Sequence, residues 1–562
     1  MIVYGDRSRC VSPRAELARI AAALSAATAM RGDGRSDRML AALIDCGELA
    51  QGLADAAFEA RKVDEETPAA LAAIALTVAV AKLWLQNGGG APTAELDDLA
   101  TAELPTLVSC RIPEGYAFYG VHPAAYAAAA RRIRWGSPPL VIGLRSIGVS
   151  LAATVAAAVA AAAPISLRPH GPPFRRRVSV SNELKRRLAA HPGDFVVVDE
   201  GPGLSGSSFA AVATLLTSLG AAPERIAFMP SHAAGPGREA SAEVRRTWAS
   251  VRIEPAAWSP SDAEMAALFA DAAGPALTVE DLSGGAWRCG WRGPERPPAW
   301  PAQERRKARL VARGGAFVAR FAGLGRIGEE KLALARRLHD GGFAPEPLAL
   351  RNGFLLERWV EGRPPVLVGD ERAAFVATVA GYLGLRARLS AGPAEGSDPA
   401  ALREMALVNA AEAAGPQLRD GVARRLGRLE ALAAELPPVR IDGRLHLWEW
   451  RRKPDGGFVK TDGLDHAAAH DLVGCQSIAW DLAGAEVEFD LTRAESAELR
   501  RSLAMAAGAA PTRAAVEAFS VAYCAFQLGW WTFAVQSSPD ADGCAARARR
   551  DFYLERLRQL AG

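Results

Sequence analysis

The sequence is poor in cysteine and carries almost no excess charge. Its 562 residues include seven cysteines, and no two of them form a Cys-x-x-Cys pair. Cysteines scattered in this way exclude a zinc ribbon and a disulfide framework and favour a reducing compartment, so we expect a cytoplasmic protein. Lys and Arg number 66 against 63 Asp and Glu, a formal charge of +3. That balance predicts neither a nucleic-acid partner nor a membrane-surface partner.

Signals for export and membrane insertion are also lacking. The first ten residues, MIVYGDRSRC, do not show the basic and then apolar pattern of a signal peptide. The long uncharged stretch 148–167 is mostly alanine and directly follows a strand-like run. A buried helix explains this stretch better than a membrane span does.

The chain is too long for one hydrophobic core, and its pattern changes twice. Residues 1–105 are rich in Ala and Leu at helical spacing and predict a helical domain. Residues 106–275 alternate strand-like and helix-like segments, which predicts a doubly wound parallel sheet. A Pro- and Gly-rich junction leads into residues 280–562, where a strand-rich stretch precedes a mainly helical remainder. The expected fold class is therefore multidomain, α/β and α+β.

The stretch 195–209, FVVVDEGPGLSGSSF, combines the features of a sugar-phosphate site. Its apolar run predicts a buried strand, and Asp199 and Glu200 follow at the end, where parallel sheets bind ligands. The glycines let the backbone approach a ligand, and the serines can cap a helix whose N-terminus binds anions. Carboxylates suit ribose hydroxyls or a metal, and the loop suits a phosphate. The alternative is an ordinary strand–turn–helix unit.

This stretch resembles the hallmark of the type I phosphoribosyltransferase family: four apolar residues, two acids, a short linker and a Thr/Ser-Gly-x-Thr/Ser loop. The resemblance implies that Asp199 and Glu200 hold the ribose hydroxyls of phosphoribosyl pyrophosphate, with Mg²⁺ assisting. The linker 201–204 has four residues, where the usual pattern has three. VIGLRSIGV, residues 141–149, is similar to the family's pyrophosphate loop and implies a catalytic Arg145. The other implied substrate-binding residues are Ser146, Gly148, Gly203, Ser205, Gly206, Ser207 and Ser208.

A second resemblance covers the last part of the chain. RIDGRLHLWEW (440–450) and KTDGLDH (460–466), followed by Asp481-Leu482-Ala483, resemble the catalytic and metal segments of aminoglycoside phosphotransferase-like kinases. FVARF, residues 317–321, fits the strand that carries the nucleotide lysine in that family, and Glu329 or Glu330 fits its partner glutamate on the next helix. The resemblance implies a two-lobed kinase-like domain that uses Mg²⁺, with ATP as the candidate nucleotide.

The family's chemical groups are changed at several positions. Arg320 stands where the lysine is expected. With His446 aligned to the second histidine, Arg444 occupies the place of the catalytic aspartate, and Asp442 is the candidate substitute base. The metal candidates are Asp462, Glu449 and Asp465. The alternative for residues 440–450 is a packed Trp-rich strand with a hydrogen-bonded His446.

The combined expectation is an enzyme that transfers a phosphoribosyl group from phosphoribosyl pyrophosphate, or a similar sugar phosphate, to a small-molecule acceptor. Two alternatives stay open. One is a small-molecule kinase whose other domain binds a sugar phosphate. The other is a non-catalytic sensor of nucleotide or sugar phosphate, in which both sites have lost their chemistry. The sequence does not identify the acceptor.

Overall fold

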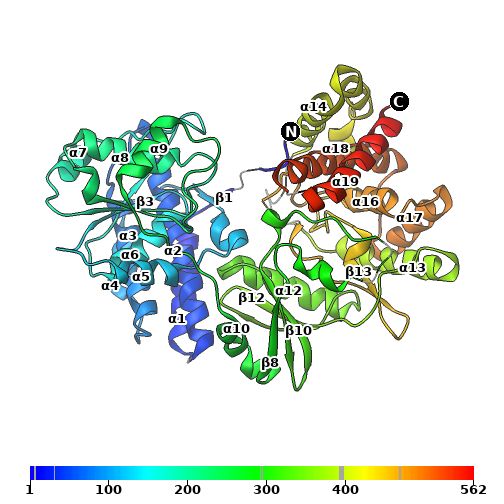
Figure 1. Cartoon of the computed structure of the whole chain (residues 1–562), viewed down its shortest axis with the longest axis horizontal. Helices are drawn as coiled ribbons and strands as arrows, with labels where there is room; N and C mark the ends of the chain where they lie inside the picture. Colours follow the sequence, from blue (N-terminus) through cyan, green and yellow to red (C-terminus); the bar gives the residue numbers. More distant parts are fainter. Residues whose placement is uncertain are drawn as a thin grey trace.

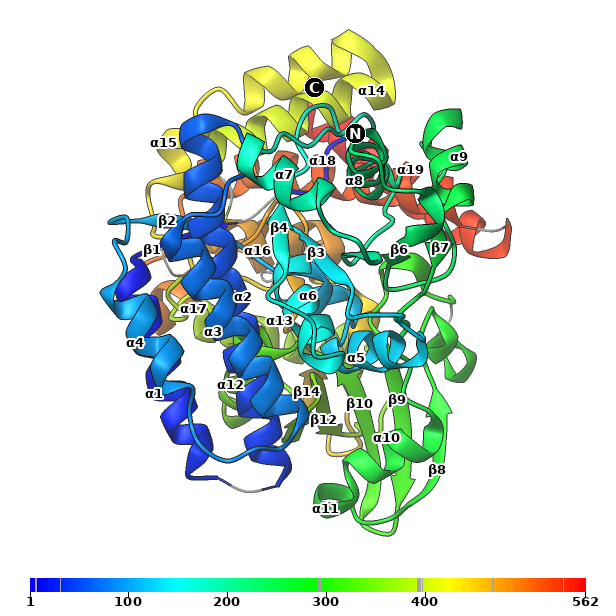
Figure 2. The ribbon, with the colours of Figure 1, turned by 90° about the vertical axis from the view of Figure 1, so that its left-hand side faces the viewer.

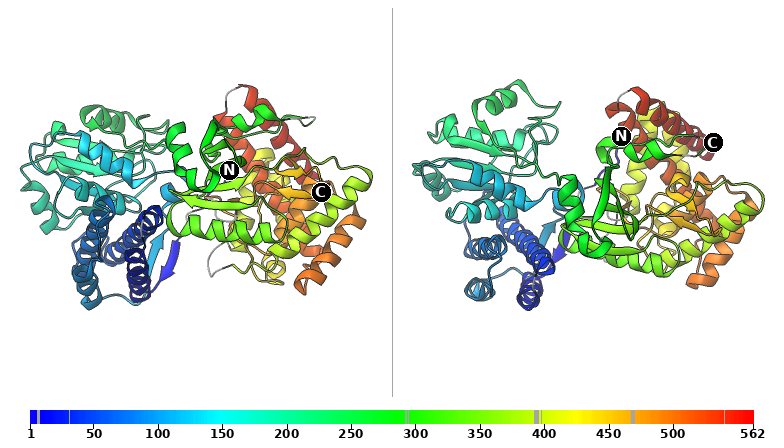
Figure 3. Two further views of the ribbon diagram at one scale, coloured as in Figure 1. Left: turned by 90° about the horizontal axis from the view of Figure 1, so that it is seen from below. Right: turned by 60° about the horizontal axis from the view of Figure 1, so that its bottom comes forward.

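The computed structural model describes residues 1–562 except 6–7, 31, 292, 294, 392–395, 397, 467–469 and 539. The chain forms two bodies that lie side by side, the first built from the N-terminal half and the second from the C-terminal half (Figure 1). Seen from below, the small sheet of the second body lies between the first body and the long C-terminal helices (Figure 3).

A parallel sheet forms the centre of the first body. Its strands are β3 (Leu140–Leu144), β4 (Ile165–Leu167), β5 (Phe195–Val198), β6 (Ile226–Met229) and β7 (Arg252–Ile253). They are ordered β4-β3-β5-β6-β7, and every neighbouring pair is parallel. Each strand of this kind needs a crossover connection, so the alternation of strands and helices predicts the parallel pairing, which is confirmed.

The two faces of this sheet belong to different hydrophobic cores. Ile142, Val197 and Phe228 point to one side, where they pack with residues of α7 (Asn182–Ala189), α8 (Ser207–Ser218) and α9 (Ala242–Ser250). Val141, Val196 and Met229 alternate with them and face the opposite core. Because side chains alternate along a strand, a sheet covered by helices on both faces reads as the continuous apolar runs seen here.

The N-terminal helices build that opposite core. They are α1 (Pro13–Thr28), α2 (Asp33–Arg61), α3 (Pro68–Leu85) and α4 (Thr93–Thr101). Residues of α1, α2 and α3 share one cluster with α5 (Pro123–Arg132), α6 (Gly148–Ala158) and the sheet. Figure 2 shows α1, α2 and α3 as neighbouring long helices on one side of the body. The expected boundary near residue 105 therefore does not separate two hydrophobic cores. The alanine-rich α6 is buried in this core, as its sequence predicts.

The second body begins with an antiparallel sheet of order β11-β12-β10-β9-β8. Its strands are β8 (Ala276–Asp281), β9 (Lys307–Ala312), β10 (Gly315–Phe321), β11 (Pro347–Arg351) and β12 (Phe354–Arg358), with α12 (Gly325–Asp340) between β10 and β11. The expected boundary at 280 falls inside β8, which pairs with β9, so this lobe starts at Ala276. The expected order of strand, helix, strand and strand is present in 315–358.

The remainder of the second body is mainly helical. Its helices are α13 (Gly369–Arg386), α14 (Pro399–Arg425), α15 (Leu429–Ala433), α16 (Ala479–Glu488), α17 (Arg493–Ala507), α18 (Arg513–Ser537) and α19 (Asp540–Ala561). A short hairpin of β13 (Trp450–Arg452) and β14 (Phe458–Lys460) faces the small lobe. Among the described residues, α3 and α18 are long and apolar enough to cross a membrane, but 56% and 83% of their apolar windows are buried inside the protein.

The first five residues belong to the second body rather than the first. The backbone N–H of Ile2 donates to Asn409 at 2.6 Å, and Tyr4 forms an isolated antiparallel bridge with Asp471. The chain then returns to the first body, where β1 (Ser8–Val11) pairs with β2 (Val108–Arg111). The N-terminal segment thus ties the two bodies together (Figure 1).

Candidate functional site

A cavity of about 600 Å³ opens at the carboxyl ends of β3 and β5. Asp199 and Glu200 follow β5, and the loop after β3 brings Ser146 to the same edge. Gly203 and Ser208 complete this side of the cavity. The strand order thus places two of the expected loops next to each other, because β3 and β5 are hydrogen-bonded neighbours and their ends meet.

The two acids form no close ion pair among the described residues, although the charge of Arg168 opposes the rise in the pKa of Asp199. The ion pairs of the described residues include neither Asp199 nor Glu200. Burial raises the pKa of Asp199 to about 7. Burial, with the neighbouring Asp199 and Glu114 carboxylates, raises the pKa of Glu200 to about 8. Carboxylates in this state gain most from a ligand that brings hydroxyl donors or a cation.

Several expected ligand groups are used inside the protein instead. Arg145 belongs to the lining of this cavity, but its guanidinium is buried and forms ion pairs with Asp64 and with Asp55. The Ser205 hydroxyl caps the N–H of Ser207 at 3.3 Å, and the Ser207 hydroxyl donates to the carbonyl of Pro173 at 3.1 Å.

Two of the glycines expected to bind the substrate are required instead by the conformation and close packing of the backbone. Gly206 has a φ of +66°, and a Cβ there would lie 2.6 Å from Nε1 of Trp248. A Cβ on Gly148 would lie 2.7 Å from the carbonyl of Val198, so this glycine lets α6 approach β5. Of the expected phosphate loop, only Gly203 and Ser208 line the cavity.

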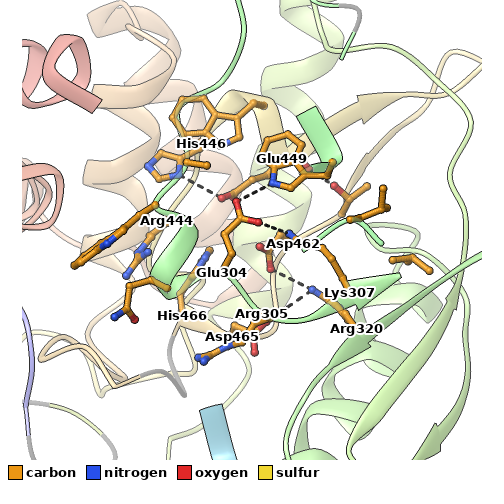
Figure 4. A pocket seen from close by; sticks show the side chains of 18 of the residues that line it. Glu304, Arg305, Lys307, Arg320, Arg444, His446, Glu449, Asp462, Asp465 and His466 are labelled. Atoms are coloured by element: carbon orange, nitrogen blue, oxygen red, sulfur yellow. Dashed lines mark hydrogen bonds and ion pairs between the residues drawn. The ribbon is translucent and has the colours of Figure 1, made fainter. Parts of the chain in front are cut away.

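A second cavity, of about 290 Å³, lies between the small lobe and the helical lobe of the second body. Charged side chains of both signs converge in it, from β9, β10 and the segments that flank the hairpin of β13 and β14 (Figure 4). The Pro- and Trp-rich segment between β8 and β9 also contributes to the lining. The tryptophans that line this cavity are Trp287, Trp300, Trp359, Trp448, Trp530 and Trp531.

Arg320, on β10, connects the two lobes across this cavity. Its Nε lies 2.9 Å from Glu357 of β12, and its NH1 lies 3.2 Å from Asp462 of the helical lobe. The expected helix partner, Glu330, instead pairs with Arg326 at 2.9 Å and Arg440 at 3.4 Å. Arg320 of the strand thus pairs with one acid of β12 and one acid of the helical lobe, while Glu330 of the helix pairs with other arginines.

The helix contributes a cation instead. Lys331 of α12 is buried and donates to Asp465, and this ammonium holds the pKa of the Asp465 carboxyl well below its usual range. Asp465 was expected to bind a metal, but its charge is already neutralised by Lys331.

Asp442, the candidate substitute base, is enclosed and does not line the cavity. Tyr382 donates to its carboxylate, the ammonium of Lys460 lies 3.2 Å away, and His466 lies 3.3 Å away. These partners hold the pKa of Asp442 well below its usual range despite its burial. A carboxylate so stabilised is a weak base, so the expected role does not fit this position.

The segment around Asp442 is anchored by Asp481. The Asp481 carboxylate accepts the backbone N–H groups of Asp442 at 2.7 Å and Gly443 at 2.9 Å. Arg444 follows and does line the cavity, where it pairs with Asp471 at 2.7 Å and lies 3.6 Å from the ring centre of Trp530. Arg444 thus lies in the cavity beside Asp471 and Trp530, and its correspondence to a catalytic aspartate stays a prediction.

Three side chains converge in a way that could hold a cation. The ligand atoms of Glu449, Asp462 and His466 all lie within 4.8 Å of one another. Glu449 also contacts Lys460 at 2.6 Å and His446 at 3.3 Å. His446 is therefore hydrogen-bonded, and its ring also stacks on Trp448. Two carboxylates and an imidazole fit a divalent cation. His466 was missed from the sequence, although it lies four residues after Asp462.

The acids of this cavity are already compensated by neighbouring cations. Asp462 has Arg320, Glu449 has Lys460, and Asp465 has Lys331 within ion-pair distance. A cation or phosphate that enters the cleft must therefore replace one partner of an existing ion pair, because each of these three acids already has a cation beside it.

Comparisons with known proteins find no matching family model and no matching curated protein. Among solved structures, the choline kinase LicA from Streptococcus pneumoniae is 14% identical, covers 50% of this chain and 94% of its own, and has a TM-score of 0.34. Spectinomycin phosphotransferase APH(9)-Ia, solved with ADP and spectinomycin, is 9% identical, covers 54% and 98%, and has a TM-score of 0.36. A thermostable mutant of aminoglycoside phosphotransferase APH(4)-Ia is 15% identical, covers 52% and 98%, and has a TM-score of 0.33. These three are phosphotransferases similar to about half of the chain, and at such scores the similarity alone decides neither fold nor function.

Proposed function

We propose that the second cavity is a kinase-like cleft that binds a nucleotide together with a divalent cation. The observation that carries this proposal is the convergence of Glu449, Asp462 and His466 opposite Arg320, between a small antiparallel lobe and a helical lobe. Glu449 and Asp462 are the two residues that would hold Mg²⁺, with His466 as a third ligand. When bound, Mg²⁺ neutralises phosphate charge.

The residues of the cleft define what this site can do. If Asp462 held the cation, the planar guanidinium of Arg320 would be available to a phosphate. Arg444, paired with Asp471 beside Trp530, is a second cation for the phosphate chain. Phosphoryl transfer also needs a group that positions the acceptor hydroxyl and accepts its proton. Arg444 cannot accept a proton, and we therefore propose tight binding with slow phosphoryl transfer to a small molecule.

A thermal-shift assay beside an ATP-hydrolysis assay tests this proposal. We expect Mg-ATP to stabilise the protein, ATP without Mg²⁺ to stabilise it less, and Asp462→Ala to remove the Mg²⁺-dependent part. Glu346→Gln, on an exposed carboxylate that pairs with Arg358, is the matched control and keeps the shift. The proposal of nucleotide binding is refuted if Mg-ATP shifts neither protein, and the proposal of slow transfer is refuted if turnover is rapid.

A second function is favoured by a different observation in the first cavity. Asp199 and Glu200 form no ion pair among the described residues. They lie at the edge of a parallel sheet, beside the glycine- and serine-rich loop that follows β5. We propose that they accept hydroxyl hydrogen bonds from a sugar phosphate, in the manner that the phosphoribosyltransferase resemblance implies. Displacement at the anomeric carbon then releases pyrophosphate. The Arg145 guanidinium is bound to Asp55 and Asp64. The backbone of its loop, and not this side chain, would therefore contact the leaving group.

Titration with phosphoribosyl pyrophosphate in the presence of Mg²⁺ tests this second function. The double variant Asp199→Asn with Glu200→Gln removes two charged acceptors, and lost hydrogen bonds to charged groups cost about 1.5–3 kcal/mol each. We expect at least a tenfold loss of affinity. Unchanged affinity in a folded double variant rules out this assignment, and ribose 5-phosphate serves as the probe that lacks the leaving group.

A further inference from the structure

The two cavities share a wall, and that wall is one short segment. Tyr119 lines both cavities and is the last residue of the helical turn η1 (Gly115–Tyr119). Figure 1 shows this light-blue turn between the two bodies. Segment 114–119 therefore separates the acids of the first cavity from the charged cleft of the second.

One end of the segment is fixed to the first cavity. The backbone N–H of Gly115 is hydrogen-bonded to the Glu200 carboxylate. A Cβ on Gly115 would lie 2.7 Å from Oε2 of Glu200 and 2.7 Å from Cδ1 of Ile147, so the backbone packs directly against both. A ligand that reorients the Glu200 carboxylate must therefore act on the position of Gly115.

The other end of the segment is fixed to the second cavity. The Tyr119 hydroxyl lies 2.7 Å from Nδ1 of His470, and Nε2 of His470 lies 3.2 Å from Oε1 of Glu114. The Phe118 carbonyl accepts a hydrogen bond from Arg305 at 2.6 Å. His470 and Arg305 line the second cavity, while Glu114 lines the first.

We propose that segment 114–119 couples the two cavities, so that a sugar phosphate at Asp199 and Glu200 and a nucleotide in the charged cleft strengthen each other's binding. This inference rests on both proposed functions. A ligand that holds Glu200 also holds Gly115 and, through five residues of backbone, Tyr119. The second ligand then meets a wall that is already ordered, and the loss of conformational entropy occurs once instead of twice.

Isothermal titration of the full chain tests the coupling with two defined probes. Phosphoribosyl pyrophosphate with Mg²⁺ is titrated into the protein alone and into the protein saturated with a non-hydrolysable ATP analogue, and the experiment is repeated in the reverse order. We expect an affinity gain of about fivefold or more, the lower end of common coupling factors. Thermodynamic linkage requires the same factor in both directions.

Two matched variants locate the coupling. Tyr119→Phe keeps the ring but removes the hydroxyl bond to His470, and we expect the coupling factor to fall towards one. Tyr4→Phe is the control, because Tyr4 lies near His470, with ring centres 5.1 Å apart and ring planes tilted by 36°, and lines the second cavity but not the first. We expect this control to keep the wild-type factor.

The outcomes separate the inference from the functions beneath it. If both probes bind and the factor is one, the coupling is refuted and both proposed functions stand. If one probe alone does not bind, the proposed function of that cavity is refuted, and the coupling falls with it. If Tyr4→Phe abolishes the coupling and Tyr119→Phe does not, the wall assigned here is not the connection.

Discussion

Replacing the two acids of the first cavity should stabilise the protein at alkaline pH. Burial raises the pKa of Asp199 to about 7 and that of Glu200 to about 8. An acid whose pKa rises on folding binds its proton more tightly in the folded state. Its contribution to stability therefore falls as the pH rises from its unfolded pKa, about 4, towards its folded pKa. Asp199→Asn with Glu200→Gln removes this penalty.

The size of the effect follows from the pKa shift. A rise of about three units for one acid corresponds to about 4 kcal/mol, since each unit is about 1.4 kcal/mol. Water in the open cavity screens part of this cost, so we expect the double variant to gain about 1–3 kcal/mol at pH 8.5. The gain should fall towards zero below pH 4, where the acids become protonated in both states.

Thermal unfolding of the first body, followed at pH 4.5, 6.5 and 8.5, measures the gain. For a domain of this size, one kcal/mol moves the midpoint by about 2–4 °C. The exposed Glu224→Gln is the matched control, and we expect it to show no comparable pH trend. A double variant that is less stable than wild type at pH 8.5, or a gain equal at all three pH values, would refute the reasoning.

Three further predictions concern buried contacts inside one or the other of the two bodies. Lys331→Met removes the nearest cation of the buried Asp465, leaving Arg320 at 3.9 Å, and should cost about 3–5 kcal/mol in denaturant unfolding, while Lys331→Met with Asp465→Leu should recover most of it. Gly206→Ala, which meets Trp248 at a φ of +66°, should lower the thermal midpoint more than Gly203→Ala, which has a similar φ of +61° but open space around it. Asp481→Ala removes the acceptor of two backbone N–H groups and should cost about 1–3 kcal/mol for each buried donor left unpaired, measured in the same unfolding assay.

The local elements of the fold were predictable from the sequence because their signals are local. The apolar run before Asp199 is strand β5, and the alanine-rich run after Gly148 is helix α6. The partners of an apolar helix are not encoded locally, because any apolar surface of matching shape can bury it. Helices within 1–105 therefore looked like a separate domain but share a core with the sheet.

The candidate sites were predictable to the extent that they follow strand ends. Asp199, Glu200 and Ser146 meet at one edge because β3 and β5 are neighbours. The pairing of Arg145 with Asp55 and Asp64 could not be predicted, because these acids lie more than 80 residues earlier in the chain. Spacing along the chain also does not reveal the cations that pair with Asp442 and Asp465, which bear on their expected roles.

The docking of the N-terminal segment onto the second body sets an order of events during synthesis. Ile2 bonds to a residue 407 positions later in the chain. At about 5–20 residues per second, a ribosome needs roughly 20–80 s to make that partner after the N-terminus has emerged. During this interval β1 can pair with β2, but the residues before it have no docking site. A fusion partner placed before Met1 would therefore interfere with the last step of assembly rather than with the folding of the first body.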